Sequence, residues 1–290
     1  MREYLVNLYY NILRPIFKNR RALVGFTILM GFVVMAIIGP LVVPLNLKTN
    51  WKERFKPPSL EHLLGTDYGG RDIFQQIVHG SRDVLLIAAL SALFAILLAV
   101  TIGITSGFLG GAVDVVLMGI TDIFLTIPSF PVMMAIAAVL KVRDPFSFAA
   151  VISMWMWAGL ARSIRAEVLS LKQKEFIEAA KILGLGTFHI VFREIMPNIM
   201  PYIAINFITM MRAAITASVG IMFLGIVPFK ITHWGVMLNL AMFQYGAVYV
   251  PEGVHYALAP LLCIVLLEYG AVSLSHGLEE IFNPRLKTYE

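Results

Sequence analysis

Residues 175–197 read EFIEAAKILGLGTFHIVFREIMP and differ in character from the sequence around them. This stretch combines charged residues, glycines and a closing proline, whereas the neighbouring segments are apolar enough to lie in lipid. A polar, helix-forming segment between two membrane spans has to lie in water on one face of the membrane, because a charged side chain in the bilayer is costly. We therefore expect these residues to be the part of the chain best placed to meet a soluble partner.

The composition predicts an integral membrane protein. Of the 290 residues, 59% are hydrophobic and 14% are charged, and the mean hydropathy is +0.80. A typical soluble domain has about 25% charged residues. Cys263 is the only cysteine, which excludes a disulfide framework and a cysteine-rich metal site. The net charge of +5 is small and dispersed, so we expect the lipid bilayer and no nucleic acid as a partner.

Apolar segments of sufficient length predict six membrane spans, since about 20 helical residues cross a hydrocarbon core of about 30 Å. The third segment contains Asp122, Pro128 and Pro131. Because proline removes a backbone donor and disturbs the preceding turn, we expect this span to be broken or kinked. The predicted spans are residues 22–47, 84–113, 115–140, 145–161, 195–229 and 254–278.

The predicted fold class is therefore an all-α integral membrane protein with a polar loop at about residues 168–195. We divide the chain into residues 1–82, with the N-terminal tail, the first span and the next loop, and residues 83–290, with the other five spans. Six spans place both termini on one side, and lysine and arginine are more numerous on that side. Since cytoplasmic loops are enriched in these residues, both termini and the polar loop are expected in the cytoplasm.

Small residues gather beside an acid within the polar stretch. On a helix, Glu178, Ala179, Ala180 and Gly184 would form a patch that another surface can approach closely, with a carboxylate at its border. Pro197 fits the first turn of the span that follows. From these residues alone, a loop helix whose charges are merely solvated is an equally good interpretation.

The spacing of these residues resembles the signature loop of the permease subunits of ABC importers. Glu-Ala-Ala is followed after three residues by Gly184 and, thirteen residues later, by Pro197. In that family the loop forms short coupling helices that insert into a groove on the ATP-hydrolysing subunit. By position, the resemblance assigns this role to Glu178, Ala179, Ala180, Gly184 and Pro197. Glu194 and Met196 depart from the isoleucine and leucine that the family often has, which affects the expected local packing.

A second motif, HLLGTDYGGRD at residues 62–72, resembles the extracytoplasmic segment of the dipeptide and oligopeptide branch of those permeases. Its glycines permit a tight turn, and its aspartates can cap a helix or pair with the arginine. One interpretation is that the motif only fixes how the chain enters the second span. The other is that it helps to dock a solute-binding protein or to gate the outer mouth. The residues concerned are Gly65, Thr66, Asp67, Gly70, Arg71 and Asp72.

A third match lies near the C-terminus, at residues 258–260, 276–279 and 283–285, so the resemblance covers about residues 10–287. It implies a type I ABC importer permease in the inner membrane of a prokaryote. The partners that it implies are a second, non-identical permease subunit, two ATPase subunits that carry ATP and Mg²⁺, and an extracytoplasmic solute-binding protein.

No motif for chemistry is present in the sequence. The phosphate-binding pattern Gly-x-x-x-x-Gly-Lys-Ser/Thr is missing, so we expect no ATP, no other cofactor and no catalysis on this chain. The pattern His-Glu-x-x-His is missing too, and single loop histidines such as His189 and His233 are expected to be solvated rather than catalytic.

Three charged residues within the predicted spans need a polar environment: Asp122, Arg212 and Glu268. Arg212 and Glu268 could line the passage, with Arg212 meeting a substrate carboxylate. Alternatively, they form an interhelix pair or contact a second permease subunit, and Asp122 forms hydrogen bonds between helices. A self-sufficient secondary transporter or channel is the alternative from another class, but these charges are few and scattered for a proton or ion path.

Gly103, Gly107 and Gly111 recur at every fourth position near the end of the second span. Such a small-residue face predicts close approach of a neighbouring helix in lipid. That helix could belong to this subunit or to a second permease subunit.

The substrate predicted from the resemblance is a di- or oligopeptide. Peptide permeases of this branch often have Gln-Pro-Pro before Trp-Gly, whereas residues 226–235 read IVPFKITHWG. This departure keeps an oligosaccharide, or less favourably a nickel chelate, as an alternative. Four aromatic residues could stack on sugar rings or form the interfacial belt of a membrane protein: Trp234, Phe243, Tyr245 and Tyr249.

Overall fold

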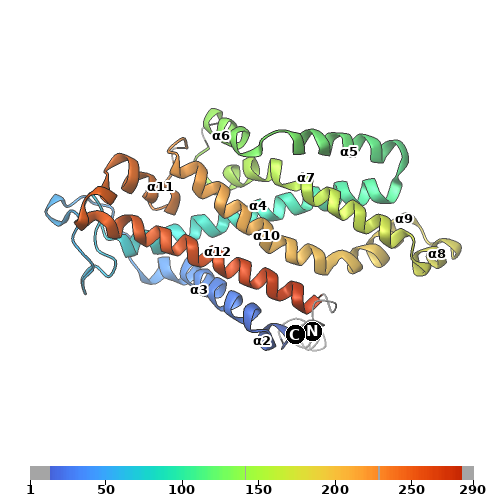
Figure 1. The fold of residues 1–290 in the computed structure, drawn as a ribbon, viewed down its shortest axis with the longest axis horizontal. Helices are drawn as coiled ribbons and strands as arrows, with labels where there is room; N and C mark the ends of the chain where they lie inside the picture. Colours follow the sequence, from blue (N-terminus) through green and yellow to red (C-terminus); the bar gives the residue numbers. More distant parts are fainter. Residues whose placement is uncertain (1–13, 141, 228, 283–290) are drawn as a thin grey trace.

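Long helices make up the chain in the computed structural model, which describes residues 14–140, 142–227 and 229–282 (Figure 1). Within these ranges the backbone forms no strand, and its isolated β-bridge joins Thr66 to Asp72. Five helices are long and apolar enough to cross a membrane, and a bent pair gives a sixth span. The predicted all-α membrane fold is thereby confirmed.

The helices follow one another through short connections, apart from a long loop between the first and second spans. The main helices are α2 (Arg14–Lys18), α3 (Arg20–Val42), α4 (Ile73–Leu109), α5 (Gly111–Thr126), α6 (Ser129–Val139), α7 (Pro145–Lys172), α8 (Glu175–Ile182), α9 (Thr187–His189), α10 (Met196–Phe223), α11 (Trp234–Asn239) and α12 (Val254–Phe282). The shorter turns are the 3₁₀ helices η2 (Trp51–Glu53), η5 (Ala247–Tyr249) and η6 (Pro251–Gly253) and the π-helices η3 (Ile190–Ile195) and η4 (Leu240–Gln244). Some residues used in the predictions lie outside the described ranges: Arg2, Lys141, Arg285 and Lys287 of the orientation argument, and residues 283–285 of the C-terminal motif.

The third span is broken where the sequence predicted a break. α5 and α6 meet at an angle of 86°. Ile127 is extended, with φ −80° and ψ 129°, because a residue that precedes a proline is disfavoured from helical conformation. Pro128 then precedes α6, and Pro131 lies in its first turn, where the missing N–H would have no partner within the helix.

Charged residues that we expected to end the second and fourth spans lie within helices instead. α4 begins at Ile73 rather than at residue 84, and it includes Asp83, whose carboxylate lies 3.0 Å from the ammonium group of Lys230. α7 continues past residue 161 to Lys172. The division predicted between residues 82 and 83 falls inside α4, which is continuous across it.

The first and fifth spans end earlier than predicted. α3 ends at Val42 because Val43 precedes Pro44 and is extended, with φ −99° and ψ 112°. α10 ends at Phe223, and Gly225 follows with φ +72°, a left-handed conformation that favours glycine after a helix.

Glycines let α4 and α7 pack closely along their length. A Cβ atom on Gly103 would lie 2.6 Å from the carbonyl oxygen of Ala161, and one on Gly107 would lie 3.0 Å from that of Arg165. These two glycines therefore serve packing within the subunit. Gly111 takes no part in this packing, because it begins α5 with φ +57° and nothing in the described part of the subunit lies within 4 Å of its Cβ position. Its contact with a second permease subunit stays a prediction.

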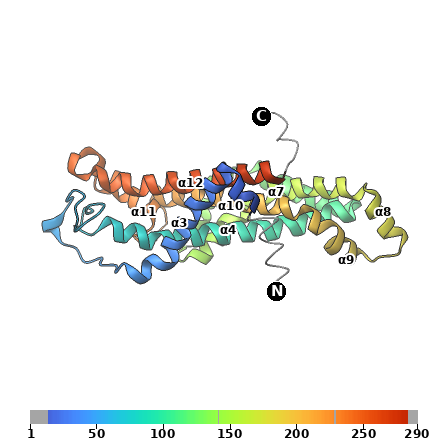
Figure 2. The same cartoon turned by 90° about the horizontal axis from the view of Figure 1, so that it is seen from below.

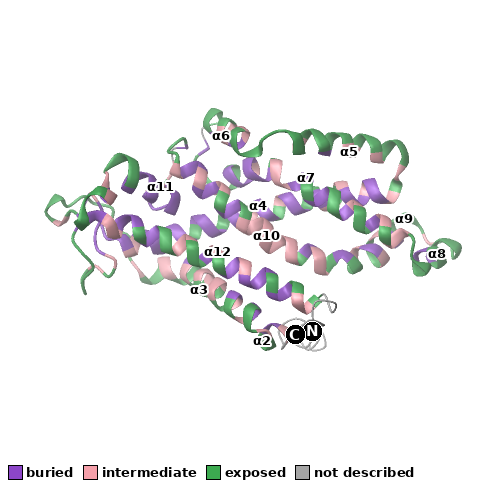
Figure 3. Cartoon of the chain, viewed as in Figure 1, coloured by how far each residue is buried: buried purple, intermediate pink, exposed green. Residues whose placement is uncertain are grey.

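The first and last spans also pack through small residues. A Cβ atom on Gly277 of α12 would lie 2.5 Å from the backbone nitrogen of Ala22 in α3. Figure 2 shows the loop between α3 and α4 at one end of the molecule and α8 at the other. Burial is concentrated in α4 and α7, whereas α5 and α8 are mainly exposed (Figure 3).

Candidate functional site

The polar stretch forms a helix that projects from one end of the bundle. One side of α8 is held in place because Ile177 and Ala180 are buried in a core that also contains Ile190 and Ile195. Glu178 is exposed on the outside of this helix. The predicted small patch is therefore smaller than expected: Ala179 and Gly184 are exposed with Glu178, but Ala180 packs inward.

Gly184 ends α8 in a Schellman motif. Its φ is +73°, its N–H donates to the carbonyl of Lys181 at 3.0 Å, and the N–H of Leu185 donates to Ala180 at 3.1 Å. The left-handed conformation required at this position favours glycine. Gly184 thus fixes where the helix stops and how the chain returns to the bundle.

The tip of this segment carries an exposed apolar surface that the sequence reasoning missed. Ile182 and Leu183 are 81% and 76% exposed, although they lie between the membrane-crossing helices. Phe188, in the first turn of the helix Thr187–Phe223, is 75% exposed. Exposed apolar surface of this kind marks a contact with another protein or with the membrane. We call it the α8 surface, made of Phe176, Glu178, Ile182, Leu183, Phe188 and Phe192.

Pro197 does not begin the helix of the fifth span. The helical backbone is already formed at Thr187 and reaches α10 through the π-helix Ile190–Ile195. Pro197 lies in the first turn of α10, and neither it nor Pro201 has an N–H to donate. The π-helix lies directly before these two prolines. A π-turn is one of the irregularities by which a helix continues past missing backbone hydrogen bonds.

Lys172 joins the start of the polar stretch to the end of another span. Its ammonium group donates to the carbonyl oxygens of Phe108 and Gly107, at 2.8 and 3.2 Å. These carbonyls belong to the last turn of α4, where a cation is favoured by the helix dipole. The end of α7 is thereby fastened to the end of α4.

The loop motif at residues 62–72 folds around a buried carboxylate. Asp67 Oδ1 accepts from the backbone N–H groups of Gly69 and Arg71, at 2.8 and 2.9 Å. Its Oδ2 accepts from Arg71 Nε at 2.9 Å and from Gln76 Nε2 at 3.0 Å. Asp67 and Arg71 are both buried, so the pair is shielded from water and the carboxylate is fully hydrogen-bonded.

The rest of the motif connects this loop to the start of α4. Asp72 caps the helix by accepting from Gln75 N–H at 2.9 Å, and its other oxygen lies 2.8 Å from His62 Nδ1. Thr66 accepts from the backbone N–H of Lys56 at 2.8 Å. Gly65 and Gly70 have φ of +77° and +71°, and a side chain on Gly70 would collide with the carbonyl of Asn50.

The burial of the motif favours the first of its two interpretations, that it fixes the entry into the second span. Its polar residues are occupied by contacts within the chain and offer little surface to a docking protein. The most exposed large apolar side chains of the same loop are instead Trp51, Leu60 and Leu63.

Of the four aromatic residues considered for sugar stacking, one is buried and one is stacked on another aromatic ring. Trp234 is fully buried, and its indole N–H donates to the carbonyl of Ile77 at 3.1 Å. The ring of Tyr245 stacks on that of Tyr68, with centroids 3.4 Å apart. Phe243 and Tyr249 are exposed.

His233 is buried rather than solvated, contrary to expectation. Its Nδ1 accepts from the backbone N–H of Gly235 at 3.2 Å and so caps α11. Burial, aided by the positive charge of Lys230, lowers the pKa of His233 to about 3. The imidazole is therefore neutral at pH 7, with its proton on Nε2.

Two ion pairs join α5 to α7. Asp114 accepts from Arg165 Nε and Nη2 at 2.5 and 2.6 Å, and Asp122 pairs with Arg162. The expected interhelix role of Asp122 is thus seen as an ion pair, on an exposed face of the two helices.

Arg212 and Glu268 do not form the direct pair that we considered. Instead, Glu268 Oε1 accepts from the hydroxyl of Thr216 at 2.7 Å, which joins α12 to α10. Arg212 lies one turn before Thr216 and makes no ion pair with the described part of the chain.

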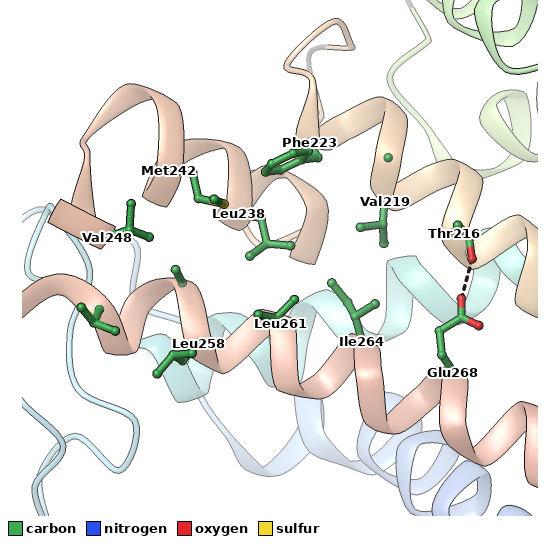
Figure 4. Close-up of a pocket in the computed structure, with 13 residues that line it drawn as sticks. Thr216, Val219, Phe223, Leu238, Met242, Val248, Leu258, Leu261, Ile264 and Glu268 are labelled. Atoms are coloured by element: carbon green, nitrogen blue, oxygen red, sulfur yellow. Dashed lines mark hydrogen bonds between the residues drawn. The ribbon is translucent and has the colours of Figure 1, made fainter.

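A groove of about 590 Å³ lies between α10, α11 and α12. Figure 4 shows Glu268 and Thr216 at one end of it, joined by their hydrogen bond, and apolar side chains along the rest. The groove could not be predicted from the sequence, because its walls form only when the consecutive helices α10, α11 and α12 fold against one another.

Comparison with known proteins places these features in a family. Residues 99–288 match the family described as "Binding-protein-dependent transport system inner membrane component". Residues 8–58 match the "N-terminal TM domain of oligopeptide transport permease C".

Relatives with similar sequences extend over almost the whole chain. The dipeptide transport system permease protein DppC of Bacillus subtilis (strain 168) is 31% identical over 279 residues, which are 94% of this chain and 85% of the relative. The oligopeptide transport system permease protein OppC of the same strain is 31% identical over 272 residues, 93% of this chain and 87% of the relative. The chain therefore belongs to the family of binding-protein-dependent transport system inner membrane components, the permease subunits of ABC importers.

Proposed function

We propose that this inner-membrane, multi-pass subunit forms part of the passage of an ATP-driven importer for di- or oligopeptides and couples that passage to separate ATPases. The observation that carries the proposal is the α8 surface, where Glu178 lies beside exposed apolar side chains at the end of the bundle. An apolar surface of this kind needs a protein to cover it in water. In this family the covering protein is expected to be an ATPase subunit.

The attachments of α8 suit it to transmit movement. Its inner side packs on Ile190 and Ile195, which lead directly into α10. On the other side, the end of α7 is fastened to α4 by Lys172. Displacement of α8 by closure of the ATPases would therefore shift α7 and α10 together and alternate the passage between its two openings.

The complete transporter would contain a second, non-identical permease subunit, two ATPase subunits holding ATP and Mg²⁺, and an extracytoplasmic solute-binding protein. The α8 surface would lie in the cytoplasm together with both termini, and the loop between α3 and α4 would lie outside. The excess of lysine and arginine on the α8 side supports this orientation.

The names of the relatives favour a di- or oligopeptide as the substrate. The relatives are named as dipeptide and oligopeptide permeases, and the N-terminal match is to an oligopeptide permease. The oligosaccharide alternative relied on four aromatic residues, of which Trp234 is buried and Tyr245 is covered by Tyr68.

The test is ATP turnover by the complex of this chain with its partner subunits and binding protein in proteoliposomes. Stimulation by di- or oligopeptides supports the proposal, whereas stimulation by oligosaccharides alone would overturn the substrate and retain the architecture. Solute flux through this chain without ATPase subunits would favour a secondary transporter or channel instead.

A further inference from the structure

Glu268 places a carboxylate in the middle of a membrane-crossing helix. It lies halfway along α12, at one end of the groove between α10, α11 and α12 (Figure 4). An acid at this depth is costly unless it faces a cation or a polar cavity. Its place in the groove therefore calls for an explanation.

Only one of the two oxygens of this carboxylate accepts a hydrogen bond in the described part of the chain. Oε1 accepts from Thr216, whereas Oε2 has no hydrogen-bond partner within the described ranges. No ion pair reaches Glu268 from any described lysine, arginine or histidine. The positive charge of Arg212 on α10 acts on Glu268 from a distance, but Oε2 itself is left for a further donor.

The remainder of the groove is apolar. Apart from Thr216 and Glu268, it is lined by aliphatic, aromatic and methionine side chains and by a glycine. Its volume of about 590 Å³ lies in the range of about 300–1,000 Å³ typical of small-molecule sites. Prominent lining residues are Val219, Phe223, Leu238, Met242, Leu261 and Ile264.

We propose that this groove binds the N-terminal residue of a transported peptide, with its free ammonium group on Glu268 and its apolar side chain along α10 and α12. The inference rests on the proposed peptide transport. The chemistry selects the N-terminus because a carboxylate attracts an ammonium group and repels the C-terminus. A sugar would need several hydrogen-bonding groups, whereas this lining has two polar side chains.

The experiment compares uptake of a tripeptide with an N-terminal leucine and of its N-acetylated form. Proteoliposomes contain the whole transporter and a saturating amount of one binding protein, so the preference of that protein is the same in every sample. Wild type is expected to take up the free peptide faster. In Glu268→Gln the ratio of the two rates should fall about tenfold, the factor that corresponds to one hydrogen bond to a charged group.

Two further variants separate binding from structure. Glu268→Asp keeps the charge and should retain part of the preference. Thr216→Val removes the hydroxyl that donates to Glu268 but leaves the carboxylate, and it should retain the preference for the free amine. Glu268→Gln itself can still accept from Thr216 through its amide oxygen.

Three outcomes count against the proposal in different ways. An unchanged ratio in Glu268→Gln overturns it. Failure of Glu268→Gln to assemble with the other subunits also overturns it and assigns Glu268 to a contact with the second permease subunit. If wild type transports neither peptide but responds to oligosaccharides, the proposed function fails first, and the present inference falls with it.

Discussion

Arg71 donates from Nε to Asp67 Oδ2 at 2.9 Å, and both side chains are buried in the loop between α3 and α4. Asp67 in turn accepts from two backbone N–H groups and from Gln76. A pair of this kind is sensitive to loss of one partner, because the other charge is then left buried without compensation.

Asp67→Asn should therefore destabilise the subunit by about 3–5 kcal/mol. The measurement is the midpoint of thermal unfolding of the purified complex in detergent. Glu61→Gln is the matched control, since Glu61 is exposed in the same loop and should change stability by no more than about 0.5 kcal/mol. Equal midpoints for the two variants would contradict a structural role for the buried pair.

Glu178→Lys should uncouple ATP turnover from substrate while leaving the amount of assembled subunit unchanged. Glu178 is exposed on α8, beside the apolar tip, so reversing its charge alters a contact surface and not the core. The readout is stimulation of ATPase activity by substrate-loaded binding protein. Glu167→Lys reverses an exposed charge on α7, outside the α8 surface, and should leave stimulation intact. Normal stimulation in Glu178→Lys would remove Glu178 from the coupling contact.

Gly103→Ala should weaken the packing of α4 on α7. The added methyl group would lie 2.6 Å from the carbonyl oxygen of Ala161 and 2.9 Å from the Ile164 side chain. Forcing the helices apart costs about 1–3 kcal/mol, which thermal unfolding can measure. In the control Gly119→Ala the new methyl group meets nothing within 4 Å, so this substitution should be neutral or slightly stabilising. Comparable losses in both variants would argue against close packing at Gly103.

His233 should make stability depend on pH. Its pKa is lowered to about 3 by burial and by Lys230, against about 6.5 in the unfolded chain. Below about pH 6.5 the unfolded state binds a proton that the folded state does not, so stability is complete above that pH and falls as the pH drops towards 3, by at most about 1.4 kcal/mol per pH unit.

His233→Asn tests this pH dependence. Asparagine can also cap α11 through its side-chain oxygen but does not titrate. The difference in unfolding midpoint between pH 7.5 and pH 5 should therefore be smaller in the variant than in wild type. An equal difference in the two proteins would show that His233 does not cause it.

Local sequence signals predicted the broken third span and the helix in the polar stretch. Ile127, which precedes Pro128, is extended, as the local steric effect of a following proline favours. Ile177 and Ala180 lie three positions apart and are buried, whereas Glu178 between them is exposed. This spacing is typical of a helix with one buried side and is visible in the sequence. Such features depend on the backbone and on near neighbours, which are available without the tertiary structure.

Features that depend on distant neighbours could not be predicted in this way. Asp83 lies within α4 because Lys230, 147 residues away, neutralises it. Trp234 is buried because the carbonyl of Ile77 accepts its N–H. The groove that holds Glu268 likewise forms only when α10, α11 and α12 come together.

The 37 residues of α4 span about 55 Å at about 1.5 Å per residue. One end is capped by Asp72 inside the buried loop motif, and the other is held by Lys172 next to α8. α4 is therefore a continuous rod that crosses the whole subunit. If α8 is the contact for the ATPases, as we propose, a push delivered there would reach the opposite side as a tilt of this rod, with the loop at that side as its pivot.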